Sequence, residues 1–128
     1  MGNSELLSFF PVASDEQIEK TKRYMESYRK AKKVIETFPH AASEKQKAII
    51  RDAERAVGII LDEEVRRVIE FRYIQGNSHK TTIQYFTSRG MSESTVGRRI
   101  TEGLASIANT LVFCGVFEVE DDSKRKAE

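Results

Sequence analysis

The order of elements that decides the fold is found in residues 77–111, which read NSHKTTIQYFTSRGMSESTVGRRITEGLASIANTL. Residues 80–88 predict a short helix, and Arg89-Gly90-Met91 predicts a turn, because glycine accepts a positive φ without steric cost. Ser92 is placed to cap a second, longer helix. At about 100° per residue, one side of this helix carries the apolar residues Val96, Ile100, Leu104, Ile107 and Leu111. The stretch therefore predicts a helix-turn-helix whose second helix packs through an apolar stripe.

Three more helices are predicted upstream of this stretch. Residues 15–38 contain neither Gly nor Pro, and their apolar side chains recur at helical spacing. Ser43 opens a capping box at the start of a helix over residues 44–60. Asp62 can cap a third helix, which Gly76 ends. We therefore predict a small all-α fold of about five helices that ends in a helix-turn-helix.

The predicted organisation has three regions. An N-terminal helical region, made of an arm and two helices, covers residues 1–60, and the helix-turn-helix region covers residues 61–112. Residues 113–128 form a tail of mixed charge with an acidic excess. Only residues 112–119 have the β-branched and aromatic content that is typical of a short strand, so a short C-terminal strand is also expected.

Charge is distributed unevenly along the chain. The 128 residues include 21 Lys and Arg against 20 Asp and Glu, and the net charge of +1 argues neither for nor against a nucleic-acid partner. Residues 64–100, however, contain seven Lys and Arg against three Asp and Glu, a local charge of +4. Residues 118–128 contain five acids against three bases, a local charge of −2. Such segregation is common in proteins that bind nucleic acids.

The composition argues against several classes of protein. Cys114 is the only cysteine, so no intrachain disulfide can form, and neither it nor His40 and His79 has partners at metal-ligand spacing. We find no paired nucleophile and base and no phosphate loop, and therefore expect no enzyme, no metal and no cofactor. The longest apolar run, residues 111–117, is too short to span a membrane, and we expect no secretion signal. The expected location is the cytoplasm, with no membrane partner.

Polar residues near the start of the last predicted helix are candidates for reading DNA. Ser94, Thr95 and Arg98 lie opposite the apolar stripe, and Glu93 is the first residue of the helix. An α-helix of this kind fits the major groove. The candidate base contacts are Glu93, Ser94, Thr95 and Arg98. Arginine can donate two hydrogen bonds to guanine, and short hydroxyl side chains can contact bases or phosphates. Glu93 could accept a hydrogen bond from cytosine, or it could equally stabilise the helix dipole.

Residues at the start of the shorter predicted helix are candidates for phosphate contacts. Exposed backbone N–H groups and the positive end of the helix dipole favour an anion at such a position. The candidates are Lys80, Thr81 and Thr82, together with Arg99 of the longer helix. Ordinary capping and solvation explain the first three equally well, so both interpretations stay open.

Two segments of the chain resemble region four of bacterial sigma factors. Residues 61–76 begin with LDEEV and end with FRYIQG, and residues 92–100 contain SESTV followed by RRI. Upstream, KRYMESYRKAK at residues 22–32 resembles the N-terminal helix of the ArpU-type phage regulators, whose relatives include the RinA-like proteins. This resemblance implies a sequence-specific, sigma-like activator of late bacteriophage or prophage genes for packaging and lysis.

The partner that this resemblance implies is double-stranded DNA. Bacterial RNA polymerase and a second copy of the chain, in a homodimer, are further candidate partners. Two other functions stay open. One is a DNA-packaging adaptor similar to a small terminase subunit, which works as an oligomeric ring. The other is an interaction module whose helices bind a polymerase subunit while Arg98 is merely solvated.

Overall fold

The computed structural model describes residues 13–117, and all of their regular structure is helical. In chain order the elements are α2 (Asp15–Thr37), η1 (Pro39–Ala41), α3 (Glu44–Gly58), α4 (Glu63–Ile69), η2 (Glu70–Ile74), α5 (His79–Thr87) and α6 (Glu93–Phe113). The prediction of a small all-α fold is confirmed. The predicted N-terminal arm lies almost entirely outside the described residues, and of the predicted tail over residues 113–128 only residues 113–117 are described.

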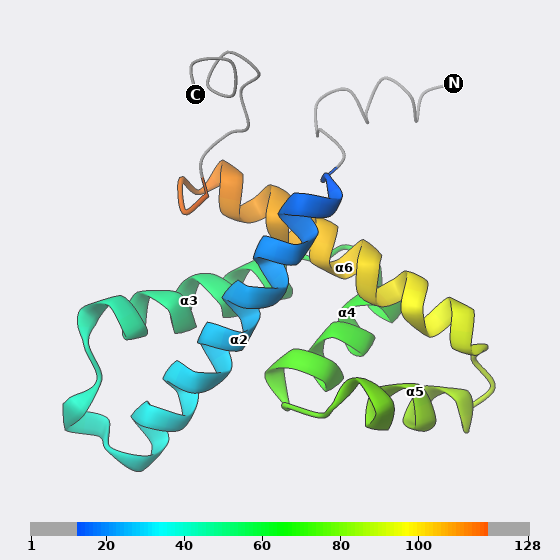
Figure 1. The fold of residues 1–128 in the computed structure, drawn as a ribbon, viewed down its shortest axis with the longest axis horizontal. Helices are drawn as coiled ribbons and strands as arrows, with labels where there is room; N and C mark the ends of the chain where they lie inside the picture. Colours follow the sequence, from blue (N-terminus) through cyan, green and yellow to red (C-terminus); the bar gives the residue numbers. More distant parts are fainter. Residues whose placement is uncertain (1–12, 118–128) are drawn as a thin grey trace.

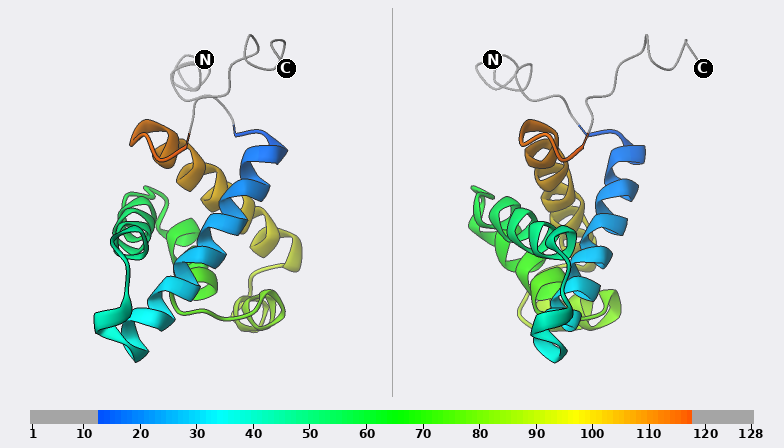
Figure 2. Two further views of the ribbon diagram at one scale, coloured as in Figure 1. Left: turned by 60° about the vertical axis from the view of Figure 1, so that its left-hand side comes forward. Right: turned by 90° about the vertical axis from the view of Figure 1, so that its left-hand side faces the viewer.

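The other helices are arranged around α6, which contacts α2, α3, α4 and α5. α2 and α3 form a helical hairpin joined through η1, and α2 crosses α6 (Figure 1). In the view of Figure 1, α3 lies to the left of α2, and α4, η2 and α5 lie to its right, next to the N-terminal half of α6. The turned view on the right of Figure 2 shows that α3 and α4 both lie on the side of α2 that faces α6. α5 and the start of α6 therefore occupy one end of the molecule, away from the turn of the α2–α3 hairpin.

Side-chain caps fix where the helices begin. Ser43 Oγ accepts a hydrogen bond from Gln46 N at 3.1 Å, and Gln46 Oε1 accepts one from Ser43 N at 2.9 Å. At the start of α4, Asp62 Oδ1 accepts hydrogen bonds from the backbone N–H groups of Glu64 and Val65. Each cap of this kind stabilises a helix by about 1 kcal/mol. The predicted starts of both helices are confirmed.

The apolar stripe predicted for α6 lies in the core. Its five members are all buried: Val96, Ile100, Leu104, Ile107 and Leu111. They pack in one cluster with Met25 and Tyr28 of α2 and with Ala53 and Val57 of α3. The spacing of apolar residues in the sequence therefore identifies the face on which α6 is buried.

α4 and α6 approach each other closely at Gly103. A Cβ atom on this glycine would lie 2.5 Å from Ile69 Cδ1 and 3.2 Å from Val65 Cγ1. Glycine inside a helix costs about 1 kcal/mol relative to alanine, and here the burial of Val65 and Ile69 against α6 offsets that cost. Gly97, the other glycine inside α6, would meet no atom within 4 Å, so packing does not require glycine there.

A π-helical segment follows α4 where the sequence predicts one continuous helix. In η2 the backbone N–H of Gln75 donates to Glu70 O at 2.8 Å, a spacing of five residues instead of four. The wider turn buries Tyr73, whereas Arg72 is only partly buried. The Arg72 guanidinium lies over the Tyr73 ring at 4.6 Å, and Nη1 donates to Asn77 O at 2.9 Å.

The described part of the expected C-terminal strand is helix and turn. α6 continues through Phe113, and Gly115 has a φ of 80°. The N–H groups of Val116 and Phe117 both donate to Leu111 O, which closes the end of the helix. The prediction of a strand is therefore wrong for residues 112–117, because Gly115 allows the left-handed turn that ends α6; residues 118 and 119 lie outside the described part.

Alanine at the two glycines inside α6 should change stability in opposite directions. Gly103→Ala should lower the free energy of unfolding by about 1–3 kcal/mol, because the added methyl group overlaps Ile69. Gly97→Ala should raise it by roughly 0.5–1 kcal/mol, because the position is open and alanine is the better helix former. Chemical denaturation of both variants measures the difference, and equal changes would contradict the close crossing at Gly103.

Candidate nucleic-acid interface

Residues 88–92 join α5 to α6 through a tight turn. Gly90 has a φ of 96°, a left-handed conformation that glycine adopts without strain. The backbone N–H of Gly90 donates to Thr87 O, and that of Met91 donates to Phe86 O, both at 3.1 Å. The predicted turn is confirmed, and its hydrogen bonds close the end of α5 before α6 begins.

An aromatic cluster that the sequence analysis misses anchors α5. The ring of Phe71 in η2 stacks on Tyr85 with centroids 4.2 Å apart, and it meets Phe86 edge-on at 5.5 Å. The Arg89 guanidinium lies 3.6 Å from the centroid of the Tyr85 ring, and Arg89 Nη1 donates to Tyr85 O at 3.1 Å. The spacing of four residues between Tyr85 and Arg89 is a signal in the sequence for this contact. The cluster holds a cation beside the turn.

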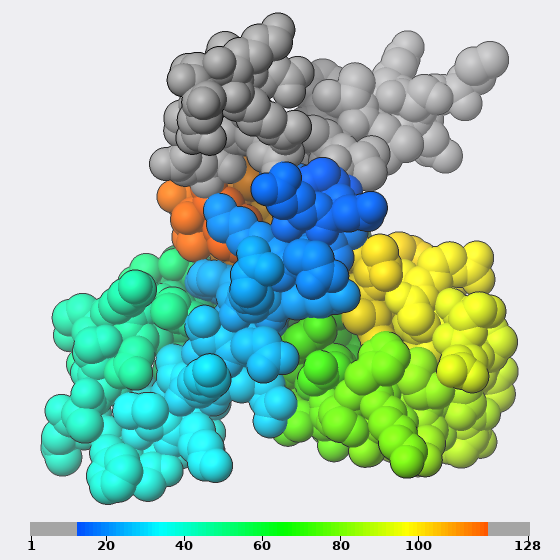
Figure 3. Space-filling model, viewed as in Figure 1, coloured from blue at the N-terminus to red at the C-terminus, as the bar shows by residue number. Residues whose placement is uncertain are grey.

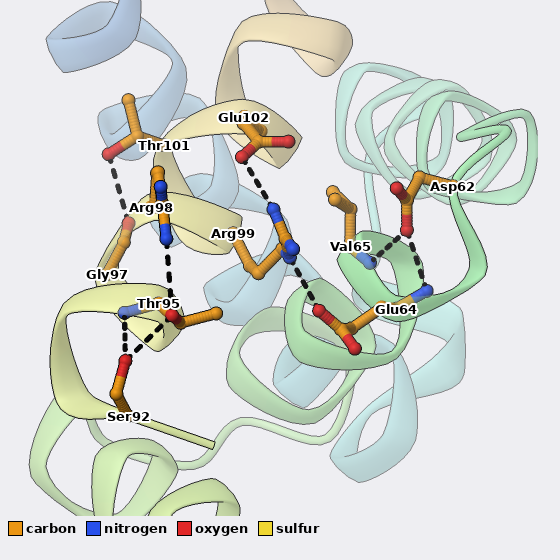
Figure 4. Close-up of polar contacts among 10 residues, drawn as sticks. All are labelled: Asp62, Glu64, Val65, Ser92, Thr95, Gly97, Arg98, Arg99, Thr101 and Glu102. Atoms are coloured by element: carbon orange, nitrogen blue, oxygen red, sulfur yellow. Dashed lines mark hydrogen bonds and ion pairs between the residues drawn. The ribbon is translucent and has the colours of Figure 1, made fainter.

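A chain of hydroxyl contacts holds Arg98 at the start of α6 (Figure 4). Ser92 Oγ accepts a hydrogen bond from Thr95 N at 3.1 Å and donates one to Thr95 Oγ1 at 2.7 Å. Thr95 Oγ1 also accepts a hydrogen bond from Arg98 Nη2 at 3.2 Å. Arg98 is exposed, so one edge of its guanidinium is held while the other N–H groups are available to a ligand.

The other two predicted base contacts, Glu93 and Ser94, are also exposed. Ser94 Oγ lies 3.3 Å from Ser92 Oγ, at hydrogen-bond distance. Within residues 13–117, Glu93 forms neither a hydrogen bond nor an ion pair through its carboxylate. Its position in the first turn of α6 suits a carboxylate next to the helix dipole, so both interpretations of Glu93 remain open.

Arg99 has a structural role that the sequence analysis does not predict. Arg99 Nε donates to Glu64 Oε1 of α4 at 2.6 Å, and Arg99 Nη1 donates to Glu102 Oε1 at 2.9 Å (Figure 4). The hydrogen bond to Glu64 is the main reason why the pKa of Arg99 lies above its ordinary value. Only 26% of the Arg99 side chain is exposed. The guanidinium therefore joins α6 to α4, and a phosphate contact of Arg99, which stays a prediction, would compete with Glu64 and Glu102.

The three remaining phosphate candidates, at the start of α5, differ in their exposure to solvent. Lys80 and Thr81 are exposed. Ser78 Oγ accepts a hydrogen bond from Thr81 N and donates one to Thr81 Oγ1, both at 3.0 Å. Thr82 is fully buried, and its hydroxyl donates to Ser78 O at 2.8 Å. The prediction for Thr82 is therefore wrong, since its side chain cannot reach a phosphate.

The described residues offer no other kind of site with a clear chemistry. An open groove beside the turn is lined by Glu63, Glu64, Arg67, Phe86, Arg89 and Met91. Across residues 13–117, no three His, Cys, Asp or Glu side chains are grouped so that they could hold a metal ion. None of the described helices combines the length and the apolar character needed to cross a membrane.

No known protein family, curated protein sequence or solved structure is found to match this chain. The resemblance to sigma region four and to the ArpU-type and RinA-like regulators therefore stays a prediction from the residues that carry it.

Lys80→Gln and Arg99→Gln should have different effects, because Lys80 is a cation at the surface whereas Arg99 forms ion pairs that join α6 to α4. Lys80→Gln should leave the melting temperature unchanged. When the logarithm of the duplex-binding constant is plotted against the logarithm of the salt concentration, the slope should be about one unit less steep. Arg99→Gln should lower the melting temperature, because Glu64 and Glu102 lose their shared partner. Thermal melts and salt titrations of both variants measure these effects. An unchanged salt slope for Lys80→Gln would remove Lys80 from the interface.

Proposed function

We propose that the protein is a sequence-specific DNA-binding transcriptional regulator. The observation that carries this proposal is the exposed face at the start of α6, where Thr95 holds the Arg98 side chain. At about 100° per residue, Arg98 lies about 160° around α6 from the centre of the buried stripe. A helix that is fixed to the core on one side and presents a held arginine on the other suits recognition in the major groove.

In the proposed mechanism, α6 enters the major groove and α5 crosses the phosphate backbone. Arg98 donates two hydrogen bonds to O6 and N7 of one guanine, and Ser94 or Glu93 contacts a neighbouring base. Lys80 and the backbone N–H groups at the start of α5 bind phosphate. Because Thr95 already restrains Arg98, less side-chain entropy is lost when the complex forms.

The regulatory role that we propose rests on the resemblance to sigma region four and to the ArpU-type and RinA-like regulators. The protein would activate late genes of a bacteriophage or prophage in the cytoplasm of the bacterial host, by contacting RNA polymerase beside the bound DNA. Exposed apolar side chains at the α3–α4 junction support a protein partner: Leu61 is 98% exposed and Ile59 is 58% exposed. The partner on this surface would be polymerase or a second copy of the chain.

The same exposed apolar residues favour a second candidate function. In that alternative the helices bind only a protein partner, and Arg98 meets solvent. Loss of all affinity for duplex DNA at low salt would favour this interaction module. Size-exclusion chromatography with light scattering tests a further alternative: a large closed ring would favour a terminase-like packaging adaptor, whereas a monomer or dimer is expected for the regulator.

Arg98→Ala should remove sequence recognition at one base position. If Arg98 contacts guanine, the variant should lose roughly 1–3 kcal/mol of binding free energy at the preferred site and much less on random DNA. Selection from random oligonucleotides, followed by affinity measurements, gives both values. Arg23→Ala is the matched control, because Arg23 is an exposed arginine of α2 that forms no ion pair within the described residues.

The same selection also shows when the assignment fails. If the Arg98→Ala variant selects the same preferred site as the unmodified protein, Arg98 contacts only phosphate or solvent. Sequence recognition would then depend on Glu93, Ser94 and Thr95. If neither protein selects a preferred sequence, the proposal of a sequence-specific regulator is contradicted.

A further inference from the structure

Arg29 of α2 lies against the loop that leads into α5, although the two are far apart in the sequence. A Cβ atom on Gly76 would lie 2.7 Å from Arg29 Nη2 and 3.1 Å from both Cζ and Nε, so the guanidinium covers this glycine. Gly76 also has a φ of 83°, which other residues rarely adopt. The backbone conformation therefore favours glycine at this position, and the end of the Arg29 side chain lies over it.

The loop under Arg29 brings the guanidinium near the start of α5. Four residues separate Gly76 from Lys80, so their Cα atoms are at most about 15 Å apart. Figure 1 shows this loop beside α2, with α5 running away from it toward the turn. In Figure 3, α2 meets the green segment of η2 and α5 on one face of the molecule. Arg29 thus lies against the loop from which α5 begins, a few residues before Lys80.

The charge of Arg29 is not compensated by a described neighbour. Its side chain is exposed, and within residues 13–117 it forms neither a hydrogen bond nor an ion pair. Glu26, one turn earlier on α2, forms no ion pair with it. Arg72, which approaches the same loop, is instead used to hold it, since Arg72 Nη1 donates to Asn77 O at 2.9 Å. Of these two arginines, Arg29 is the one available to a ligand.

We propose that Arg29 contacts a DNA phosphate and extends the DNA-binding surface from α5 onto α2. This inference rests on the proposed function. The first helix of a helix-turn-helix, here α5, crosses the phosphate backbone of the DNA. A cation on α2 next to the start of α5 would therefore contact the DNA strand that α5 crosses. A guanidinium binds phosphate through two parallel hydrogen bonds, and contact with Gly76 restrains it without using its donors. The contact adds affinity on every DNA sequence.

Arg29→Gln tests this inference, with Lys45→Gln as the matched control. Lys45 is an exposed cation of α3 that forms no ion pair within the described residues. Fluorescence anisotropy with a labelled duplex of random sequence gives the affinity as a function of salt. Arg29→Gln should weaken binding severalfold at low salt, and this defect should shrink by about threefold between about 50 and about 200 mM salt, as expected for one lost phosphate contact. Lys45→Gln should match the unmodified protein.

The outcomes separate this inference from the proposed function. If the unmodified protein binds the duplex and the two Gln variants have equal affinities and salt slopes, Arg29 is not a phosphate contact and the proposed function stands. If the unmodified protein binds no duplex at low salt, both are overturned. Arg29→Lys keeps the charge and should keep the salt slope. A slope as low as that of Arg29→Gln would assign the guanidinium a structural role and overturn the inference.

Discussion

The close crossing of α4 and α6 at Gly103 is the contact on which the rest of the structure depends. Val65 and Ile69 occupy the space that any side chain at residue 103 would need, and this sets the distance between the two helices. α4 continues into η2, and Phe71 of η2 holds α5 through its aromatic neighbours. The relative orientation of α5 and α6, and with it the geometry of the helix-turn-helix, follows from this crossing.

The same crossing gives two neighbouring arginines opposite environments. Arg99 faces α4 and is bound by Glu64 and Glu102. Arg98 lies about 100° further around the helix, and among residues 13–117 its side chain forms a hydrogen bond only with Thr95 of its own helix. The local charge of +4 over residues 64–100 therefore overstates what DNA would meet, because part of that charge stabilises the fold. A count of charges in the sequence cannot separate a cation that binds a ligand from one that joins two helices.

Local signals predict the helix starts, the turn and the buried stripe well, because each depends on residues within a few positions of one another. The caps at Ser43 and Asp62 are examples. Contacts between distant residues are not predicted by such signals, since nothing in the sequence near Arg99 points to Glu64. Thr82 was misplaced for another reason: its hydroxyl is satisfied by a carbonyl of its own helix turn, so a polar side chain is buried at little cost.

An NMR titration tests the central claim most directly, namely that the first two turns of α6 and the start of α5 together contact DNA. Isotope-labelled protein is titrated with a duplex of random sequence at low salt, because each backbone amide then reports on its own environment. We predict that the largest shifts occur at residues 93–98 and 78–81, with α3 unaffected. Shifts confined to residues 59–61, or no shifts at all, would contradict a DNA-binding surface built on the helix-turn-helix.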